Sequence, residues 1–569
     1  MNSTKKISYY FRRYSAVRFI CILLVIALIV GISFLISYHS KVVPEITSIN
    51  PPVGVPGDVI VINGKNFGKE RDMNYVEFSG SKLTSSAYIS WSDTKIKLVL
   101  PANVQDGLVV VGNKNIRSKP ALFANEIDIP VLVPTVKQTT KPVITAITGK
   151  LHYRGDLLTI TGNNFGDTRG DSKVYFTIDY DDKIKNAEIV TSNMYTENMV
   201  PVSEFEAGYE FWSNTEIKVR IPDGASSGLV QIQVGDEKSE GYECEISSYG
   251  SSSVKLRRIY LMEYSADIAD LYTNDISTVT LRCPIPLETY YQPEVQITEI
   301  NPNPVLTNYQ NAIIHQLSKS KNYFPKTVFK QTFVLPVYER LSSVNADKTV
   351  NYKKGDIPFV DKALESDSLI PSENEEVKKL AAEITGKEKN NYKKAKLIYD
   401  YFCDKFKINS KVRKNDADPL DLIKSKKGDS YDFAIMYTAL LRAAGVPCLT
   451  NSGVLVLQDL TTQPHWWCEF YLPGFGWLPV DPAIGAGLEY KSWTDGGKSV
   501  DSRDFYFGNM DSHHILFSRG WAELKPFSQE NKIVQHPRSF ALQAIWEEAS
   551  ESTVKYSSYW SVPIIRGVY

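Results

Sequence analysis

Residues 423–482 constrain the fold more than any other part of this 569-residue chain. An apolar pattern with helical spacing begins after Ser430 and ends at Gly445, and Pro447 follows, as expected just beyond a helix C-terminus. A short apolar strand and two aromatic-rich runs come next, and a Pro/Gly turn at 473–476 joins the two runs. The sequence therefore predicts a helix followed by a β-hairpin. The apolar helix positions are Phe433, Tyr437, Leu440, Leu441 and Ala444.

Three polar residues on these elements form a candidate site. Ser430 opens the helix, His465 lies on the first hairpin strand and Asp481 on the second. A tight two-residue turn at 474–475 would place Asp481 opposite Cys468, which is three residues, or about 10 Å, along the strand from His465. A bulge or a longer loop is therefore needed to bring His465 and Asp481 together.

This arrangement resembles the transglutaminase-like superfamily. The similarity covers roughly residues 375–522 and includes the run Gly-x-x-x-Asp-Phe-Ala at the helix start, with a His strand and an Asp strand after it. The resemblance implies a papain-like α+β fold with a Cys-His-Asp triad, whose cysteine lies at the helix N-terminus. Those positions are Ser430, His465 and Asp481 in this chain, so a serine stands where the family has its nucleophile.

Three interpretations of Ser430 are open. Its side chain could be the helix N-cap of a domain without chemistry, a role worth about 1 kcal/mol. It could instead be the nucleophile of an amide hydrolase or acyl transferase, with His465 moving protons and Asp481 fixing the imidazole. A third interpretation uses another nucleophile, but Cys468 points to the strand face opposite His465, because residues alternate along a strand.

The N-terminal half of the chain contains an internal repeat. Ile-Asn-Gly-Lys-Asn-Phe-Gly at 62–68 returns as Ile-Thr-Gly-Asn-Asn-Phe-Gly at 160–166. Trp-Ser-Asp-Thr-Lys-Ile at 91–96 returns as Trp-Ser-Asn-Thr-Glu-Ile at 212–217. Short alternating strands with glycine turns predict a β-sandwich for each copy. The two motifs, in this order, resemble the IPT/TIG immunoglobulin-like family.

These patterns divide the chain into domains. We expect IPT/TIG-like domains at 43–128 and 142–247, with an insertion in the second copy within 168–211. Proline-rich β-like runs predict a third β-rich unit at 254–345. Helical patterns before the helix–hairpin region complete a transglutaminase-like domain at 373–525. The C-terminal segment, 526–569, receives no assignment.

The N-terminus contains a run without charge, residues 19–38, that is long enough to cross about 30 Å of hydrocarbon. Five Lys and Arg residues precede this run and only Lys41 follows closely, which places residues 1–18 in the cytoplasm and the bulk of the chain outside. A cleaved signal peptide is the alternative, but it would have a shorter apolar region and a small-residue cleavage pattern. We therefore expect an uncleaved single-pass anchor in the cell membrane.

Composition narrows the function classes. The net charge of −1 gives no basis for nucleic-acid binding. The six cysteines include no CxxC pair, so we expect neither a metal site nor a cofactor. His513 and His514 belong to no motif.

The predicted protein is multidomain: a transmembrane helix, two β-sandwiches, a third β-rich unit and an α+β transglutaminase-like domain. The first functional hypothesis is a non-catalytic binding or scaffolding protein of the cell envelope. Its partner would be a peptide, a protein or a cell-wall polymer, held in the cleft or on the IPT/TIG-like domains. The alternative is an amide hydrolase or acyl transferase that acts on such substrates through Ser430, His465 and Asp481.

The charge-free run predicts that the polypeptide stays membrane-bound with an unprocessed N-terminus. Membrane fractionation followed by mass determination of the intact chain measures this. A mature N-terminus near residue 40 would contradict the anchor and support the signal peptide.

Overall fold

A computed structural model describes most of the chain after residue 42. The predicted anchor, residues 19–38, lies outside the described residues apart from Phe19 and Ile26. Within the described ranges, no helix has both the length and the apolar composition needed to cross a membrane. The described residues are 14, 19, 26, 43–51, 53–54, 57–78, 81–83, 85–100, 107–112, 116–125, 140–149, 152–170, 172–180, 198–203, 206, 208–273, 277–319, 326–413, 418–490, 501–520, 531–536, 538–542 and 545–569.

The chain divides into two compact units, and the first contains the N-terminal β-sandwich. One sheet has the strand order β1-β3-β7-β6 and the other β2-β9-β8-β4-β5. Alternate residues of β3 and β7, such as Ile60 and Leu98, are fully buried between the sheets. The strands are β1 (Glu45–Asn50), β2 (Val53–Gly54), β3 (Val59–Lys65), β4 (Tyr75–Phe78), β5 (Ser81–Lys82), β6 (Tyr88–Trp91), β7 (Lys95–Val99), β8 (Gly107–Gly112) and β9 (Ala121–Asn125).

The second unit begins with a sandwich of the same design. Its sheets have the orders β10-β12-β16-β15 and β14-β13-β17-β18, and β19 also pairs with β17. The strands are β10 (Val143–Ile147), β12 (Leu157–Asn163), β13 (Lys173–Ile178), β14 (Met199–Pro201), β15 (Tyr209–Trp212), β16 (Glu216–Arg220), β17 (Ala225–Val234), β18 (Glu237–Lys238) and β19 (Tyr242–Cys244).

The repeated motifs make the same contacts in both sandwiches. The Trp91 indole N–H donates to the carbonyl of Phe67, and the Trp212 indole N–H donates to that of Phe165. A Cβ on Gly64 would lie 2.0 Å from the Glu45 carbonyl oxygen. The motif therefore has glycine where an adjacent strand and a core phenylalanine leave no room for a side chain.

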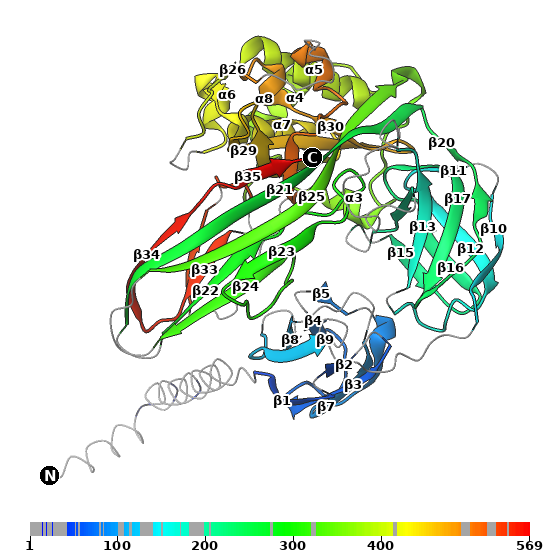
Figure 1. Cartoon of the computed structure of the whole chain (residues 1–569), viewed down its shortest axis with the longest axis vertical. Coiled ribbons are helices and arrows are strands. Elements are labelled where there is room, and N and C mark those ends of the chain that lie inside the picture. The colour runs from blue at the N-terminus through cyan, green and yellow to red at the C-terminus, as the bar shows by residue number, and fades with distance from the viewer. Residues whose placement is uncertain are drawn as a thin grey trace. The chain divides into compact units, whose positions relative to one another are not determined.

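A third β-sandwich follows, built around the long antiparallel pair of β21 (Gly250–Thr273) and β25 (Thr327–Val344). Its sheets are β23-β25-β21-β34, with β35 also on β21, and β24-β22-β33-β32. Two C-terminal strands, β34 and β35, pair with β21, so the C-terminal segment has a structural role in this sandwich (Figure 1). The remaining strands are β22 (Ser277–Pro284), β23 (Gln296–Asn301), β24 (Ala312–Lys319), β32 (Lys532–Gln535), β33 (Trp546–Ala549), β34 (Thr553–Trp560) and β35 (Ile564–Val568).

The α+β domain has an antiparallel sheet, β30-β29-β28-β31, with helix α7 packed on β28 and β29. Figure 1 shows α7 beside β29. Helices α4 and α5 pack on α7. The other face of β28 and β31 contributes Val454 and Phe517 to the core of the third sandwich. The elements are α3 (Pro358–Lys362), α4 (Glu375–Thr385), α5 (Asn391–Lys405), α6 (Asp421–Ser425), α7 (Ser430–Ala443), β28 (Cys448–Val456), β29 (Thr462–Leu472), β30 (Gly476–Val480), α8 (Pro482–Gly485), α9 (Ser502–Phe505) and β31 (His514–Arg519).

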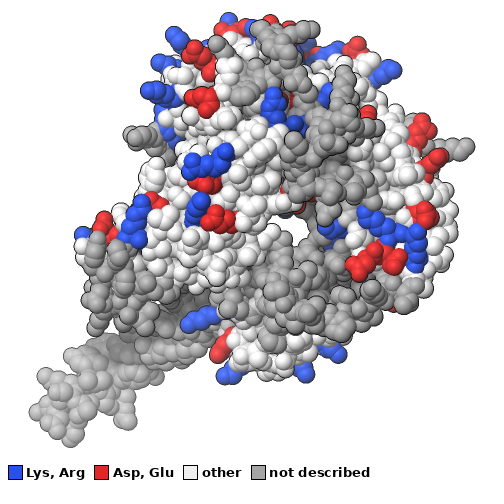
Figure 2. Space-filling view, in the orientation of Figure 1, with Lys and Arg blue, Asp and Glu red and all other residues white. Residues whose placement is uncertain are grey.

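Charge is mixed on the surface, as the net charge of −1 implies. On the face shown in Figure 2, Lys and Arg side chains are interspersed with Asp and Glu, and no large area of one sign is visible among the described residues.

The motif contacts predict a specific sensitivity in the first sandwich. We expect a fragment of residues 43–128 to unfold cooperatively on heating. Gly64→Ala should lower its free energy of unfolding by about 3 kcal/mol, because the new Cβ collides with Glu45 and Phe67. Gly57→Ala is the matched control. Its Cβ meets nothing within 4 Å, so only the positive φ of 96° opposes it, at about 1 kcal/mol. Circular dichroism measures both, and equal losses would contradict the collision.

Candidate functional site

Helix α7 begins at Ser430, but the preceding residue supplies its N-cap. The Asp429 carboxylate accepts the backbone N–H of Asp432, and the Asp432 carboxylate accepts the backbone N–H of Asp429, which completes a capping box. The interpretation of Ser430 as the cap is therefore wrong, because a carboxylate one residue earlier already accepts the free N–H. Among the described residues, the Ser430 hydroxyl makes no hydrogen bond.

Two arginines compensate the buried carboxylates at the start of α7. Arg538 lies 3.0 Å from Asp429 and 2.8 Å from Asp432, and its guanidinium stacks over Tyr431 at 4.1 Å. Arg413 contacts Asp432 at 2.5 Å. Burial and the charge of Asp432 raise the pKa of Asp429; for Asp432 burial is outweighed by Arg538, and its pKa is lowered. Sequence reasoning missed Arg538, which follows Asp429 by 109 residues and belongs to no motif.

His465 and Asp481 meet as the family resemblance implies. The hairpin loop has three residues instead of two, so Val480 pairs with Cys468 and the predicted register was wrong by one. Asp481 then continues opposite Trp467, on the strand face that also carries His465. The remaining offset is two residues, about 7 Å along the strand, which the side chains span. His465 Nε2 lies 2.6 Å from Asp481 Oδ2.

Ser430 is not joined to this pair by a hydrogen bond. His465 Nδ1 is buried, and within the described part of the chain it has no hydrogen-bond partner. The structure therefore links His465 to Asp481. Among the described residues, the Ser430 hydroxyl and His465 Nδ1 have no hydrogen-bond partner. The role of Ser430 stays a prediction.

A second histidine, which sequence analysis passed over, completes the site. His514 on β31 contacts Asp481 Oδ2 through Nε2 at 3.2 Å and Asp511 Oδ1 through Nδ1 at 2.7 Å. Tyr506 and Tyr490 donate their hydroxyl groups to Asp511 Oδ2 at 2.6 and 2.9 Å. Strand pairing with β28 alone places His514 here, so no local sequence signal could have revealed it.

Burial and charge oppose each other in this network. Burial would raise the pKa of Asp481, but His465 and His514 hold it well below its usual range. The pKa of Asp511 is likewise held low, mainly by His514 against burial. Burial disfavours the charged form of His514, yet Asp511 and Asp481 outweigh it and raise its pKa to about 9.

The other candidate side chains are core residues. Cys468 is fully buried under α7, where its sulfur accepts a hydrogen bond from the Thr438 hydroxyl and its thiol donates one to the Ala434 carbonyl. Burial raises its pKa well above the usual value, so its thiol is not a nucleophile. Trp466, Trp467 and Trp477 are also buried, so none of the three is an open groove wall.

The ligand atoms of His465, Asp481 and His514 lie within 4.8 Å of one another. Each is already committed to a hydrogen bond, and a carboxylate shared by two imidazole N–H groups accounts for the cluster. Asp481 Oδ1 is used as well, since it accepts the N–H groups of Ala483 and Ile484 at the start of α8. These residues form a hydrogen-bonded network.

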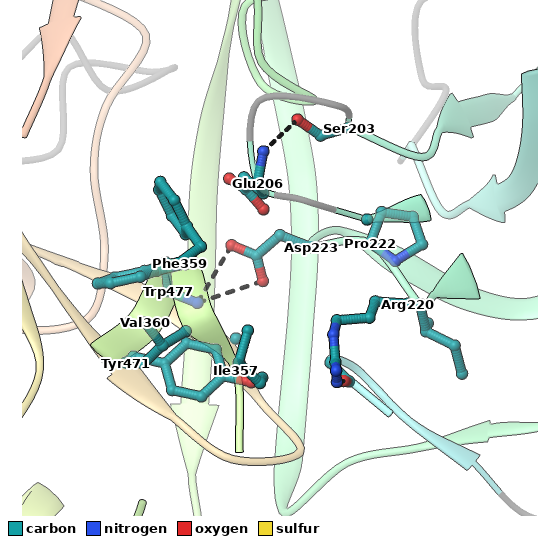
Figure 3. A pocket seen from close by; sticks show the side chains of 14 residues that line it. Ser203, Glu206, Arg220, Pro222, Asp223, Ile357, Phe359, Val360, Tyr471 and Trp477 are labelled. Atoms are coloured by element: carbon teal, nitrogen blue, oxygen red, sulfur yellow. Dashed lines mark hydrogen bonds between the residues drawn. The ribbon is translucent and has the colours of Figure 1, made fainter. Parts of the chain in front are cut away.

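A hollow of about 450 Å³, part of it open solvent, lies where the second sandwich meets the hairpin (Figure 3). Asp223 points toward Trp477 there and accepts its backbone N–H at 3.1 and 3.2 Å. Burial, reinforced by Glu206, raises the pKa of Asp223 to about 7. Glu206 pairs with Arg519, so the second sandwich is joined to the α+β domain by charged contacts.

Comparisons with known proteins agree with this architecture. A family profile described as the transglutaminase-like superfamily matches residues 378–482, and the IPT/TIG domain profile matches residues 44–124 and 142–249. The chain thus contains a transglutaminase-like domain preceded by two IPT/TIG domains.

Relatives match over limited regions. An uncharacterized protein of Haemophilus influenzae is 29% identical over 172 residues, which cover 25% of this chain and 46% of that protein. Cyclomaltodextrin glucanotransferases of Bacillus licheniformis and Paenibacillus macerans are 39% and 38% identical over 62 and 58 residues. Those segments span 11% and 10% of this chain and 8% of each enzyme.

Solved structures overlap in part. A candidate cysteine protease from Cytophaga hutchinsonii has 16% identity and a TM-score of 0.33, and covers 54% of this chain and 92% of that one. The periplasmic domain of TgpA from Pseudomonas aeruginosa has 13% identity and a TM-score of 0.22, with 40% and 86% covered. Overlaps of this size carry no functional argument.

The two arginines at α7 provide a prediction. Arg538→Met should lower the free energy of unfolding at pH 7 by about 3 kcal/mol, because it leaves Asp429 and Asp432 buried with less compensation. Arg413→Met is the matched control. Its side chain is 35% exposed, so we expect a loss below about 1 kcal/mol.

Urea unfolding at several pH values tests this. The pKa of Asp432 is lowered from its ordinary value of 3.8 in the folded protein. Its ion pairs therefore stabilise the fold fully above pH 3.8, and this contribution is lost as the pH falls further. The deficit of Arg538→Met should therefore shrink below pH 3.8. Equal losses for the two variants would contradict the assigned burial.

Proposed function

We propose that this protein is a membrane-anchored, extracytoplasmic binding or scaffolding protein whose transglutaminase-like domain holds a partner without catalysing a reaction. The observation that carries the proposal is the state of Ser430. Its hydroxyl has no hydrogen bond to His465, the contact by which a base removes the proton of a serine nucleophile.

The helix N-terminus also favours a non-catalytic role. A thiolate at this position would gain from the helix dipole and from a nearby cation, whereas a hydroxyl must lose its proton during attack. Here Asp429 takes the N–H of Asp432, and two carboxylates lie in the first turn. Negative charge beside Ser430 opposes a developing oxyanion, and Arg538 is already committed to those carboxylates.

A binding role agrees with the domain composition. IPT/TIG domains are immunoglobulin-like sandwiches, and the second one contacts the hairpin directly through Asp223 and Trp477. We propose a peptide, a protein or a cell-wall polymer as the partner, in the cleft or on the sandwiches. Anchoring through residues 19–38, with the N-terminus in the cytoplasm, is the second part of the proposal and is supported by the charge bias of the sequence.

The second candidate is an amide hydrolase or acyl transferase. It is favoured by the 2.6 Å contact between His465 and Asp481 and by the uncommitted Nδ1 of His465. In this scheme His465 accepts the Ser430 proton through Nδ1 while Asp481 holds the ring through Nε2.

A fluorophosphonate probe for activated serines separates the two candidates. We expect no labelling of the wild-type protein above the level of Ser430→Ala, because Ser430 has no base in contact. Gel fluorescence measures the labelling, with a known serine hydrolase in the same reaction as a positive control. Ser425→Ala is the matched control for a serine outside the site.

The opposite outcome is equally specific. Labelling that persists in Ser425→Ala but disappears in both Ser430→Ala and His465→Ala would replace the binding proposal with the serine enzyme.

A further inference from the structure

His514 lies between two carboxylates that can only accept hydrogen bonds. Asp511 Oδ2 receives two tyrosine hydroxyl groups, and Oδ1 receives the backbone N–H of His513 besides His514. Asp481 Oδ1 receives two backbone N–H groups, and Oδ2 faces both His465 and His514. The backbone N–H groups at these oxygen atoms can only donate, and an ionised carboxylate is the form that accepts from all of its neighbours at once. The lowered pKa values of Asp481 and Asp511 agree with that form.

The charge of His514 follows from these contacts. A neutral imidazole has one N–H and one lone pair. Both ring nitrogens of His514 face ionised oxygen atoms, at 2.7 and 3.2 Å, and a lone pair against a carboxylate would be repelled. His514 therefore carries a proton on each nitrogen, and the buried order is carboxylate, imidazolium, carboxylate.

This charge limits the choices of His465. Asp481 Oδ2 contacts both histidines, whose ring centroids are 5.5 Å apart, so His514 holds in place the same oxygen atom that faces His465. An ionised Oδ2 at 2.6 Å from Nε2 requires the His465 proton to be there. In the neutral form of His465, Nδ1 then carries the lone pair.

We propose that His514 is a positioning residue: clamped as an imidazolium between Asp511 and Asp481, it fixes the carboxylate that selects the tautomer of His465. The site consequently offers His465 Nδ1 as an acceptor to an N–H or O–H donor. If the proposed binding function holds, an amide N–H of the partner is such a donor; the assignment of His514 does not depend on that function.

The other titratable groups around His514 do not replace this role. Burial raises the pKa of Tyr490 well above its usual value, and Asp511 adds to that rise. Tyr260 contacts His513 Nδ1 at 2.9 Å, and burial keeps its pKa far above neutral. Tyr506 donates to Asp511.

Nitrogen-15 NMR of histidine-labelled full-length protein tests the assignment directly, because the chain has only seven histidines. At pH 7 we expect His514 to show two protonated nitrogens, and His465 to show a protonated Nε2 and a bare Nδ1. The spectrum of the wild-type protein alone is enough to determine the protonation of His514. A neutral His514 at pH 7 would overturn the proposal.

Two variants test whether His514 positions the His465–Asp481 pair or only supports the fold. His514→Gln and Asp511→Asn both remove the clamped charge, and both should convert the single tautomer of His465 into a mixture. His536→Gln is the matched control, since His536 also contacts a carboxylate, Glu547 at 3.1 Å, but lies outside this network. An unchanged His465 spectrum in folded His514→Gln would reduce His514 to a structural residue.

Stability against pH gives an independent readout. In the folded protein the pKa of His514 is raised from 6.5 to about 9. The charged His514 therefore contributes its full stabilisation of the fold below pH 6.5, and this contribution is lost as the pH rises through 9. We expect this loss in wild-type protein and in His536→Gln, but not in His514→Gln. An equal loss in His514→Gln would assign the pH dependence elsewhere and contradict the clamp.

Discussion

Buried carboxylates in the transglutaminase-like domain need cations, and the cations come from distant parts of the chain. Glu469 on β29 is fully buried and is held by Arg340 at 2.6 Å and Arg519 at 2.7 Å. Burial would raise its pKa, but the two arginines lower it to about 2. Because removing one partner of a buried ion pair costs about 3–5 kcal/mol, the contact with Arg340 on β25 ties the domain to the third sandwich.

The same requirement decides how far the domain extends. Asp429 and Asp432 use Arg538, and Glu469 uses Arg340. Both arginines lie outside 373–525, the range that the sequence assigns to the domain. Segments before and after the domain in the sequence therefore supply the positive charges that the buried carboxylates of the α+β sheet and α7 need. The second IPT/TIG domain joins this arrangement through Glu206 and Arg519.

Local patterns predicted the elements of the site but not all of their geometry. The apolar spacing placed α7, and the Pro/Gly turn placed the hairpin, because both signals depend on neighbours in the sequence. The register failed because 473–476 suits a loop of two residues or three, and only tertiary packing distinguishes them. A shift of one residue moves Asp481 from the face of Cys468 to the face of His465.

Residues that act only through tertiary contacts were out of reach. Arg538 and His514 lie in no motif and become significant when strands from other parts of the chain place them beside Asp429 and Asp481. The motif glycines are the opposite case. Gly64 and Gly162 were visible as a repeat, although the collision that excludes a side chain appears only in the structure.

The persistence of His465 and Asp481 beside a serine does not require catalysis. Asp481 caps α8 with one oxygen and binds two histidines with the other. Its loss would leave His514 with an uncompensated buried charge on one side and two backbone N–H groups without an acceptor. Ser430 takes part in none of these contacts. The site can therefore have a hydroxyl in place of the family's sulfur and keep the network behind it intact, which is why an intact His–Asp pair is weaker evidence for an enzyme than a serine in contact with its base.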